Sequence, residues 1–461
     1  MAERLWYGAG AGLPAITRPV MPNRVLGRHA CLLCDDSVIL GHGQRRRPGA
    51  AGIALLAAAL AVAGDAAAAQ SGEPIKIGFS MALTGPLAPN GKQALLGAKI
   101  WEEQINAKGG LLGRQVQLVT YDDQSNPATV PGIYTKLLDV DRVDLIVGPY
   151  ATNMNAPAMP IVMQRGKTFI GLFALDINSQ FHYPKYFSML PSGPSPKQSF
   201  SEGFFQLAAA QTPKPQTVAF TAEDAEFARN SCDGARASAK DFGFKSVYDK
   251  TYPPGTTDFS PIVHALQAAD ADLVVVCSYP LSSVGIVLAA NELNFTPKML
   301  GGAMVGLQAT VFKEKLKSKL NGIVNYETWV PSPKLMGPAA AFFKTYQEQA
   351  NTAGVDPLGY YLGGWGYADF QLLGEAIEGA KSINDDKLAD YLRANEFKTI
   401  MGDIRFGKDG EWSKSRMLTV QYHGITDAAN LDTWRGMSYQ TVLTPEDLKT
   451  GGLIYPYAKA K

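Results

Sequence analysis

The sequence Ile75-Lys76-Ile77-Gly78-Phe79-Ser80 begins a regular alternation of short apolar runs and amphipathic segments. Its β-branched and aromatic residues predict a buried strand. In residues 91–107, helical spacing places on one face Ala94, Leu95, Ala98, Trp101 and Ile105, and Gly109-Gly110 should end this helix. The alternation continues with strands predicted at 116–119, 145–147 and 168–172, and with helices predicted from Asn126-Pro127 and over 153–165.

A second series repeats the pattern. Strands are predicted at 217–221, 246–252, 272–277 and 298–300, and helices at 196–210, 225–241, 258–269 and 281–293. Such alternation predicts parallel sheets with helices on both faces. Two series in one chain of 461 residues therefore predict an α/β protein with two similar, doubly wound lobes. After residue 322 we expect helices at 338–352 and 360–380, a last strand at 417–422 and a loop-rich end.

A leader precedes these series. Arg45-Arg46-Arg47 is followed by an almost wholly apolar run over 48–63 and by small residues up to Ala69. These are the three parts of a secretory signal. We expect residues 1–69 to be removed between Ala69 and Gln70 and the mature chain to be periplasmic, with a membrane anchor as the alternative. Residues 1–44 suggest a start assigned too far upstream, and their Cys31 and Cys34 receive no function.

Charge and motif content argue against several classes of protein. The 43 Lys and Arg residues are balanced by 42 Asp and Glu residues, which does not favour a nucleic-acid binder. Gly85 and Gly91 are separated by five residues, and Gln93 follows Lys92, so a phosphate-binding loop is not formed. The histidines after the leader are far apart in sequence, and there is no nucleophile elbow. We therefore expect no enzyme, no metal and no cofactor.

Two cysteines, Cys232 and Cys277, remain after the leader. In an oxidising compartment they could pair. Because one falls in a predicted helix and the other in a predicted buried strand, we interpret them as two buried, unreactive thiols and leave pairing open.

The segments that follow the predicted strands mix small residues, hydroxyls and aromatics. Gly148 to Asn153 follows the third strand, Phe173-Ala174-Leu175 follows the fourth, and Ser278 to Ser282 follows a strand of the second series. In open parallel sheets, ligands bind beyond the carboxyl ends of the strands. The composition of these segments suits a compact organic ligand held by N–H and hydroxyl donors against aromatic walls.

An ordered set of motifs resembles the periplasmic binding proteins of the leucine/isoleucine/valine type, which are the type I solute receptors of ABC importers. The motifs are Leu83-Thr84-Gly85-Pro86, the run from Ile105-Asn106-Ala107 to Gly113-Arg114, Tyr121-Asp122-Asp123 and Val147-Gly148-Pro149. The resemblance implies two Rossmann-like lobes joined by three hinge crossings that close on a ligand, without catalysis. We place lobe 1 at 75–190 plus 325–412 and lobe 2 at 191–324 plus 413–461, with a crossing at Pro191–Pro194. The implied partners are a small organic ligand and membrane permease subunits, with no nucleic acid, and we expect a monomer.

The resemblance also implies positions for the ligand. The hydroxyl that meets a ligand carboxylate falls on Thr152, and the acid that pairs with an amino acid's ammonium falls near Ser282, where no Asp or Glu occurs between Asp272 and Glu292. An unpaired buried ammonium is unfavourable by several kcal/mol. We therefore expect a ligand without a free α-ammonium, such as a small aromatic or aliphatic carboxylate or amide. The expected ligand-binding residues are Asn90, Tyr150, Ala151, Thr152, Phe173, Ala174, Leu175, Phe227, Tyr279 and Ser282.

Two other functions stay open from the sequence. The same fold could act as a ligand sensor that signals to a regulator without transport, and the gene neighbourhood would separate this role from import. A hydrolase on a doubly wound sheet is the third reading, which turnover of a candidate ligand would support.

Overall fold

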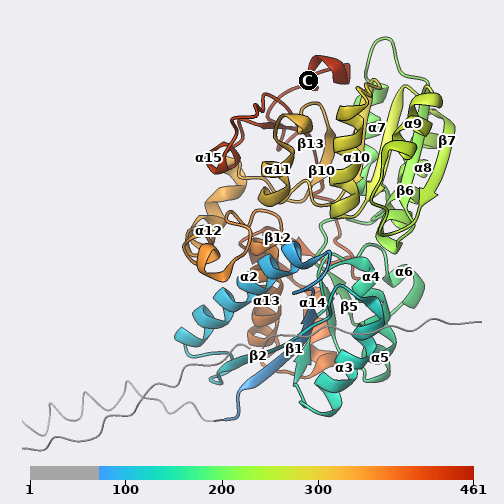
Figure 1. The fold of residues 1–461 in the computed structure, drawn as a ribbon. Coiled ribbons are helices and arrows are strands. Elements are labelled where there is room, and N and C mark those ends of the chain that lie inside the picture. The colour runs from blue at the N-terminus through green and yellow to red at the C-terminus, as the bar shows by residue number, and fades with distance from the viewer. Residues whose placement is uncertain (1–71) are drawn as a thin grey trace, which may run out of the picture. The chain divides into compact units, whose positions relative to one another are not determined.

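The computed structural model describes residues 72–461, which lie within one compact unit, Ala68–Lys461. The predicted signal, its cleavage point and the Cys31–Cys34 pair lie outside the described residues. Among the described helices, none combines the length and the apolar character needed to cross a membrane. The described part is a mixed α/β structure with two main sheets (Figure 1), as the sequence predicts.

Lobe 1 is built around a parallel three-stranded sheet with the order β2-β1-β3. β1 is the predicted strand at Ile75–Met81, and its residue Ile77 lies opposite both Leu118 of β2 and Leu145 of β3. The other strands of this lobe are β2 (Val116–Asp122), β3 (Leu145–Ile146), the parallel pair β4 (Phe169–Gly171) and β5 (Tyr186–Ser188), and the antiparallel pair β11 (Glu396–Thr399) and β12 (Gly402–Arg405).

The helices of lobe 1 come from both ends of the described chain. They are α2 (Ala88–Ala107), α3 (Val130–Asp139), α4 (Thr152–Asn155), α5 (Met159–Gln164), α6 (Asn178–Phe181), α12 (Pro333–Ala353), α13 (Gly363–Ala380) and α14 (Asp385–Ala394). α2 and α13 lie side by side at short range because both carry glycines at their contact. A Cβ atom at Gly97 would overlap the carbonyl oxygen of Gly363, so the two backbones could not approach as closely with larger residues.

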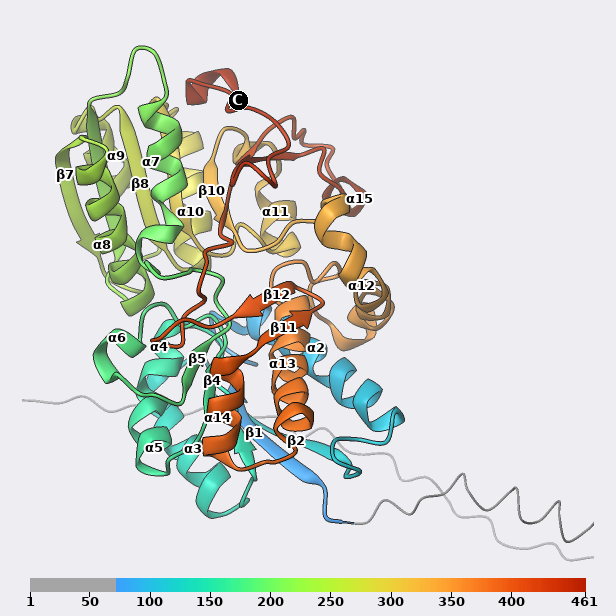
Figure 2. The ribbon, with the colours of Figure 1, turned by 180° about the vertical axis from the view of Figure 1, so that it is seen from behind.

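Lobe 2 contains a seven-stranded sheet with the order β14-β13-β10-β9-β8-β6-β7. Five strands are parallel, and the last two pair antiparallel at one edge. Figures 1 and 2 show opposite faces of this sheet, with α9 and α10 in front in one view and α7 and α8 in front in the other. The elements are β6 (Thr217–Glu223), β7 (Lys245–Tyr252), β8 (Leu273–Ser278), β9 (Met299–Met304), β10 (Val324–Glu327), β13 (Leu418–Tyr422), β14 (Gln440–Thr444), α7 (Glu202–Ala209), α8 (Glu226–Asp241), α9 (Ser260–Ala268), α10 (Pro280–Glu292), α11 (Thr310–Leu316) and α15 (Leu431–Trp434).

One predicted boundary does not match the sheets. The sequence analysis begins the second part of lobe 1 at residue 325, but β10 is hydrogen-bonded to β9 and β13, so the chain leaves lobe 2 only after Glu327. The strand was missed because its buried residues include two polar ones. Asn325 bonds the backbone N–H and C=O of Met304, and Glu327 accepts a hydrogen bond from the Tyr422 hydroxyl. These partners allow polar residues in a buried strand.

The segments that link the two lobes are bonded to one another. The Trp412 indole N–H donates to the carbonyl oxygen of Ser188 at 3.0 Å, and the Arg416 backbone N–H donates to that of Pro191 at 2.9 Å. Gly193, within the predicted Pro191–Pro194 crossing, has a φ of +76°, and a Cβ there would overlap the backbone of Ser415. Glycine is therefore required where two linking segments touch.

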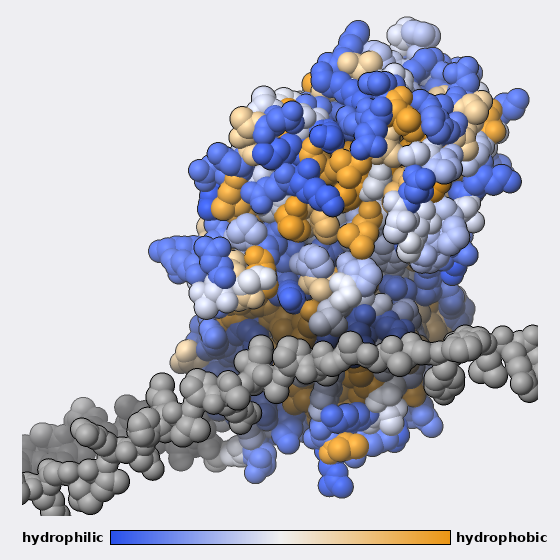
Figure 3. All heavy atoms as spheres, viewed as in Figure 1, coloured by the Kyte–Doolittle hydropathy of each residue, from blue (hydrophilic) through white to orange (hydrophobic). Residues whose placement is uncertain are grey.

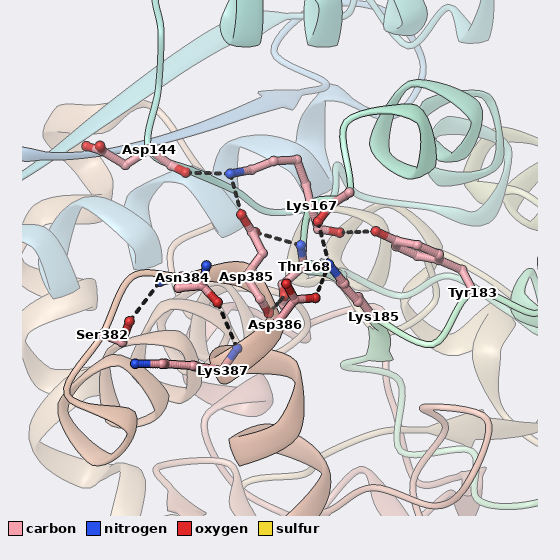
Figure 4. A network of polar contacts seen from close by, with 11 residues as sticks. Asp144, Lys167, Thr168, Tyr183, Lys185, Ser382, Asn384, Asp385, Asp386 and Lys387 are labelled. Atoms are coloured by element: carbon pink, nitrogen blue, oxygen red, sulfur yellow. Dashed lines mark hydrogen bonds and ion pairs between the residues drawn. The ribbon is translucent and has the colours of Figure 1, made fainter.

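Polar contacts attach α14 to lobe 1 (Figure 4). Asp385, in its first turn, accepts hydrogen bonds from the Lys167 ammonium and the Thr168 backbone N–H, each at 2.7 Å. The Thr168 hydroxyl donates to the Asp385 carbonyl oxygen at 2.6 Å, and Lys167 also donates to the carbonyl oxygen of Asp144. Asn384 caps the helix through the backbone N–H of Lys387. These bonds hold α14 against the residues that lead into β3 and β4.

The interpretation of Cys232 and Cys277 as free thiols is wrong. The two residues form a disulfide bond, with their Cα atoms 5.8 Å apart. α8 packs directly on β8, and each cysteine lies on the side of its element that faces the other. Both residues are buried because α8 packs on β8, and burial alone does not distinguish free thiols from a disulfide across this contact.

The surface of lobe 2 around α10 and α11 carries several apolar groups among polar ones (Figure 3). Leu281 and Val311, in the first turns of these two helices, are 58% and 44% exposed. Isolated exposed apolar residues are normal on protein surfaces and need no special role.

Candidate functional site

A small cavity, with a volume of about 20 Å³, lies where the two lobes meet. Its lining contains an unusual share of aromatic side chains. The lining residues are Tyr150, Ala151, Thr152, Phe173, Leu190, Phe200, Phe227, Tyr279, Val305, Tyr326 and Tyr361. None of these described residues carries a charge, and each is less than 9% exposed. This volume is far below the ~300–1,000 Å³ of usual ligand pockets, so the walls would have to move apart to admit an organic ligand.

The wall from lobe 1 is formed by the loops after β3 and β4. Tyr150 bridges to Leu172, and Asn155 donates to the carbonyl oxygens of Pro149 and Ala151, so its amide holds the loop in shape. Ala151 has a φ of +85°, and the next residue begins α4. Thr152 is thereby fully buried at the cavity, and its Oγ1 accepts a hydrogen bond from the Leu175 backbone N–H at 3.0 Å.

The wall from lobe 2 is a row of aromatic rings. The Phe200 ring packs against Tyr326 at 4.6 Å and against Phe227 at 5.2 Å between centroids. Phe227 in turn packs against Tyr279 at 5.7 Å. The first two contacts are edge-to-face and the third is tilted, and edge-to-face pairs add to the stability given by burial. A planar apolar group entering the cavity would meet these rings.

Three tyrosine hydroxyls form a chain along the cavity. The Asn90 amide donates to the Tyr150 hydroxyl at 3.1 Å, the Tyr150 and Tyr361 hydroxyls lie 3.3 Å apart, and those of Tyr361 and Tyr326 lie 3.4 Å apart. The last two distances are longer than the usual 2.7–2.8 Å for O–H···O bonds, so these contacts are weak. Burial raises the pKa of Tyr150 to about 12 and those of Tyr326 and Tyr361 well above their ordinary value. All three are therefore neutral at physiological pH.

A further hydroxyl, besides the Tyr361–Tyr326 contact, links the two lobes directly. The Tyr279 hydroxyl, from the loop before α10, donates to Asn153 Oδ1 of α4 at 2.8 Å. Burial raises the pKa of Tyr279 well above its ordinary value, so this donor stays protonated. The bond lies beside the cavity and joins its two walls.

The structure brings six of the ten predicted residues to the cavity: Tyr150, Ala151, Thr152, Phe173, Phe227 and Tyr279. Asn90 lies behind Tyr150, and Leu175 lies behind Thr152, so each contacts a lining residue rather than the cavity. The Ala174 carbonyl faces the Tyr186 hydroxyl, and Ser282 lies in the first turn of α10, buried but not among the lining residues.

Five lining residues were not predicted: Leu190, Phe200, Val305, Tyr326 and Tyr361. Val305 follows β9, so the rule for strand ends could have found it. Tyr326 lies within the missed strand β10, and Tyr361 lies just before α13. Nothing local marks these two tyrosines, because only the fold brings them to Tyr150.

Comparison with known proteins identifies the family of this two-lobed structure. A family model described as periplasmic binding protein matches residues 74–424. The chain belongs to this family of periplasmic binding proteins. The resemblance noted in the sequence is therefore confirmed.

Individual relatives of this periplasmic binding protein agree with the assignment. A Pseudomonas aeruginosa protein named leucine-, isoleucine-, valine-, threonine- and alanine-binding protein is 25% identical over 80% of this chain and 95% of its own length. The isoleucine complex of the Streptococcus pneumoniae branched-chain amino acid binding protein LivJ aligns with a TM-score of 0.67 at 21% identity, covering 81% of this chain and all of that chain. A Rhodopseudomonas palustris solute-binding protein in complex with benzoate aligns with a TM-score of 0.66 at 15% identity, covering 77% and 96%. The fold is that of a type I periplasmic binding protein.

Proposed function

We propose that this periplasmic binding protein captures a small carbonyl-bearing organic ligand in the aromatic cavity between its lobes and delivers it, unaltered, to the permease of an ABC importer. Membership of the family supports the role of a solute receptor. The lobes would open and close about the linking segments near residues 190, 328–332 and 413. The predicted leader would direct the chain to the periplasm.

The proposal that the ligand has no ammonium group rests on the absence of charged side chains from the described lining. A bound amino acid needs a partner for its ammonium, and none of the described lining residues is an acid. Leaving that charge unpaired would oppose binding by several kcal/mol. The relatives include proteins named for amino acids and one solved with benzoate, and the uncharged aromatic walls favour a ligand of the second kind.

A ligand screen tests the proposal. The chain from Gln70 onward is heated with leucine, benzoate, benzamide and small aliphatic acids and amides, and each hit is titrated by calorimetry. Benzoate or benzamide is expected to raise the unfolding temperature, since a ligand at 100 times its Kd adds about 2.7 kcal/mol of stability. Mass spectrometry should recover the ligand unchanged. Stabilisation by leucine alone would overturn the ligand class, and conversion of the ligand would overturn the receptor role.

A further inference from the structure

The protons of the tyrosine chain can be placed one after another. Each hydroxyl has a single proton to donate. Since the Asn90 amide donates to Tyr150, the Tyr150 proton is free to point to Tyr361, and the Tyr361 proton to Tyr326. The Tyr326 hydroxyl then accepts a bond from Tyr361 and keeps its own proton for another partner. In this arrangement, none of the hydroxyls of the chain, among the described residues, accepts the Tyr326 proton.

The orientation of the Asn90 amide sets this direction. Asn90 is fully buried, its Nδ2 bonds Tyr150, and its Oδ1 has no partner among the described residues. The flipped amide would leave the nitrogen unbonded instead. Buried N–H groups without a partner are rarer than buried carbonyl oxygens without one, so the donating orientation is favoured.

A second hydroxyl in the lining also accepts one hydrogen bond and has its own proton left to donate. Thr152 Oγ1 accepts from the Leu175 backbone N–H, so its proton is also free. The cavity thus presents two hydroxyl donors, from Tyr326 of lobe 2 and Thr152 of lobe 1, and no charged group. Phe173, Phe200 and Phe227 form apolar walls beside these donors, and an apolar ring would lie against them once the lobes move apart to admit it.

We infer that Tyr326 is a specificity-determining residue that donates a hydrogen bond to a carbonyl or carboxylate oxygen of an aromatic ligand, and that Asn90 and Tyr361 act through it as positioning residues. This inference rests on the proposed function, since it concerns the same cavity. The hydroxyl chain selects ligands that accept hydrogen bonds and excludes ligands that only donate them. The weak contacts of the chain shorten when an acceptor binds Tyr326, because donation strengthens each hydroxyl as an acceptor.

The test is calorimetric titration with four probes of similar size: benzamide, benzoate, toluene and aniline. Wild-type protein should bind benzamide and benzoate more tightly than toluene, and aniline no more tightly than toluene. Tyr326→Phe should weaken benzamide and benzoate binding about tenfold, the effect of one hydrogen bond, and change toluene binding less than about twofold. Tyr361→Phe, which breaks the chain but leaves Tyr326, should give a smaller loss for the same two ligands.

Tyr346→Phe is the matched control, because Tyr346 is buried outside the cavity and its hydroxyl has no partner among the described residues. It should leave all four affinities unchanged, and thermal unfolding should show that each variant is folded. Equal benzamide affinity in wild type and Tyr326→Phe would overturn the inference while leaving the proposed ligand class intact. Tighter binding of aniline than of benzamide would show that the hydroxyl protons point in the opposite direction along the chain. This result would also overturn the inference. Preference for leucine over all four probes would overturn both the ligand class and the role of Tyr326, but not the receptor role.

Discussion

At the scale of single residues, Glu411 is an acidic side chain buried away from water. It precedes Trp412 in a segment that links the lobes and is 7% exposed. Its Oε2 accepts a hydrogen bond from the Ser192 hydroxyl at 3.4 Å, and its Oε1 has no partner among the described residues. Burial, with a further contribution from the charge of Asp176, raises the pKa of Glu411 to about 8. The folded protein therefore holds this carboxyl in its neutral form near pH 7.

This shift predicts a stability that falls as the pH rises. The pKa is higher in the folded chain than its ordinary value of 4.5, so folding takes up a proton. The contribution is complete below about pH 4.5 and is lost as the pH rises through about 8. Glu411→Gln should remove this dependence and be more stable than wild type at pH 9 by about 4–5 kcal/mol. Urea unfolding at pH 6 and 9 measures the difference, with exposed Glu446→Gln as the control. Parallel pH profiles for wild type and Glu411→Gln would contradict the assignment.

The residues of the cavity were predictable where they follow a strand directly. Tyr150, Thr152 and Phe173 lie at strand ends that the pattern of apolar runs locates. Tyr326 and Tyr361 depend on long-range packing, because they are separated from Tyr150 by more than 170 residues of sequence and meet it only in the folded chain. Asn90 was predicted as a ligand contact, but the structure places it behind Tyr150.

At the scale of elements, the disulfide between α8 and β8 should be a major source of stability for lobe 2. It joins residues 45 positions apart. Closing a loop of this length in the unfolded chain is worth about 3–4 kcal/mol in the chain-entropy model. The double variant Cys232→Ala/Cys277→Ala should lose stability of that order in denaturant unfolding. Reductant should destabilise the wild type and leave the double variant unchanged. An unchanged wild-type unfolding midpoint in reductant would contradict the contribution.

The attachment of α14 gives a second prediction at this scale. Asp385→Ala removes the acceptor of the Lys167 and Thr168 bonds, leaving the Thr168 N–H without a partner and Lys167 with only the Asp144 carbonyl oxygen, so it should cost about 2 kcal/mol. Asp386→Ala is the neighbouring control. It removes an ion pair with Lys185 in which the Asp386 side chain is 71% exposed, and pairs of this kind contribute at most about 1 kcal/mol. Equal losses in chemical unfolding of the two variants would contradict the network of Figure 4.

Most elements of the parallel sheets were predictable, because each carries an apolar run with clear boundaries. β1, β6 and β8 begin within a residue or two of their predicted positions. β10 was not predictable, since Asn325 and Glu327 are polar and find their partners on β9 and β13. The antiparallel edge strand β14 lies in a region rich in turn residues, so the sequence predicted loops there. β10 and β14 are strands because they pair with segments distant in sequence, and a local residue pattern does not report such pairing.

At the scale of the whole described unit, the cavity depends on residues from both lobes and on the segments that link them. Tyr150 and Tyr361 come from lobe 1, Phe227 and Tyr326 from lobe 2, and Leu190 from a linking segment. A change that opens the lobes would separate these residues and expose the aromatic walls. The periplasmic binding protein is therefore expected to hold its ligand only in the closed arrangement.

Calorimetric titration of a cavity-filling variant tests the central claim most directly. Val305 is buried in the cavity lining, so Val305→Phe should occupy the space of the ligand, whereas Val311→Phe adds the same group at an exposed position on α11. With benzoate or benzamide, whichever binds the wild type, Val311→Phe should bind as the wild type does, and Val305→Phe should lose at least about 100-fold in affinity while still unfolding cooperatively. Full affinity in a folded Val305→Phe protein would show that the ligand does not bind between the lobes.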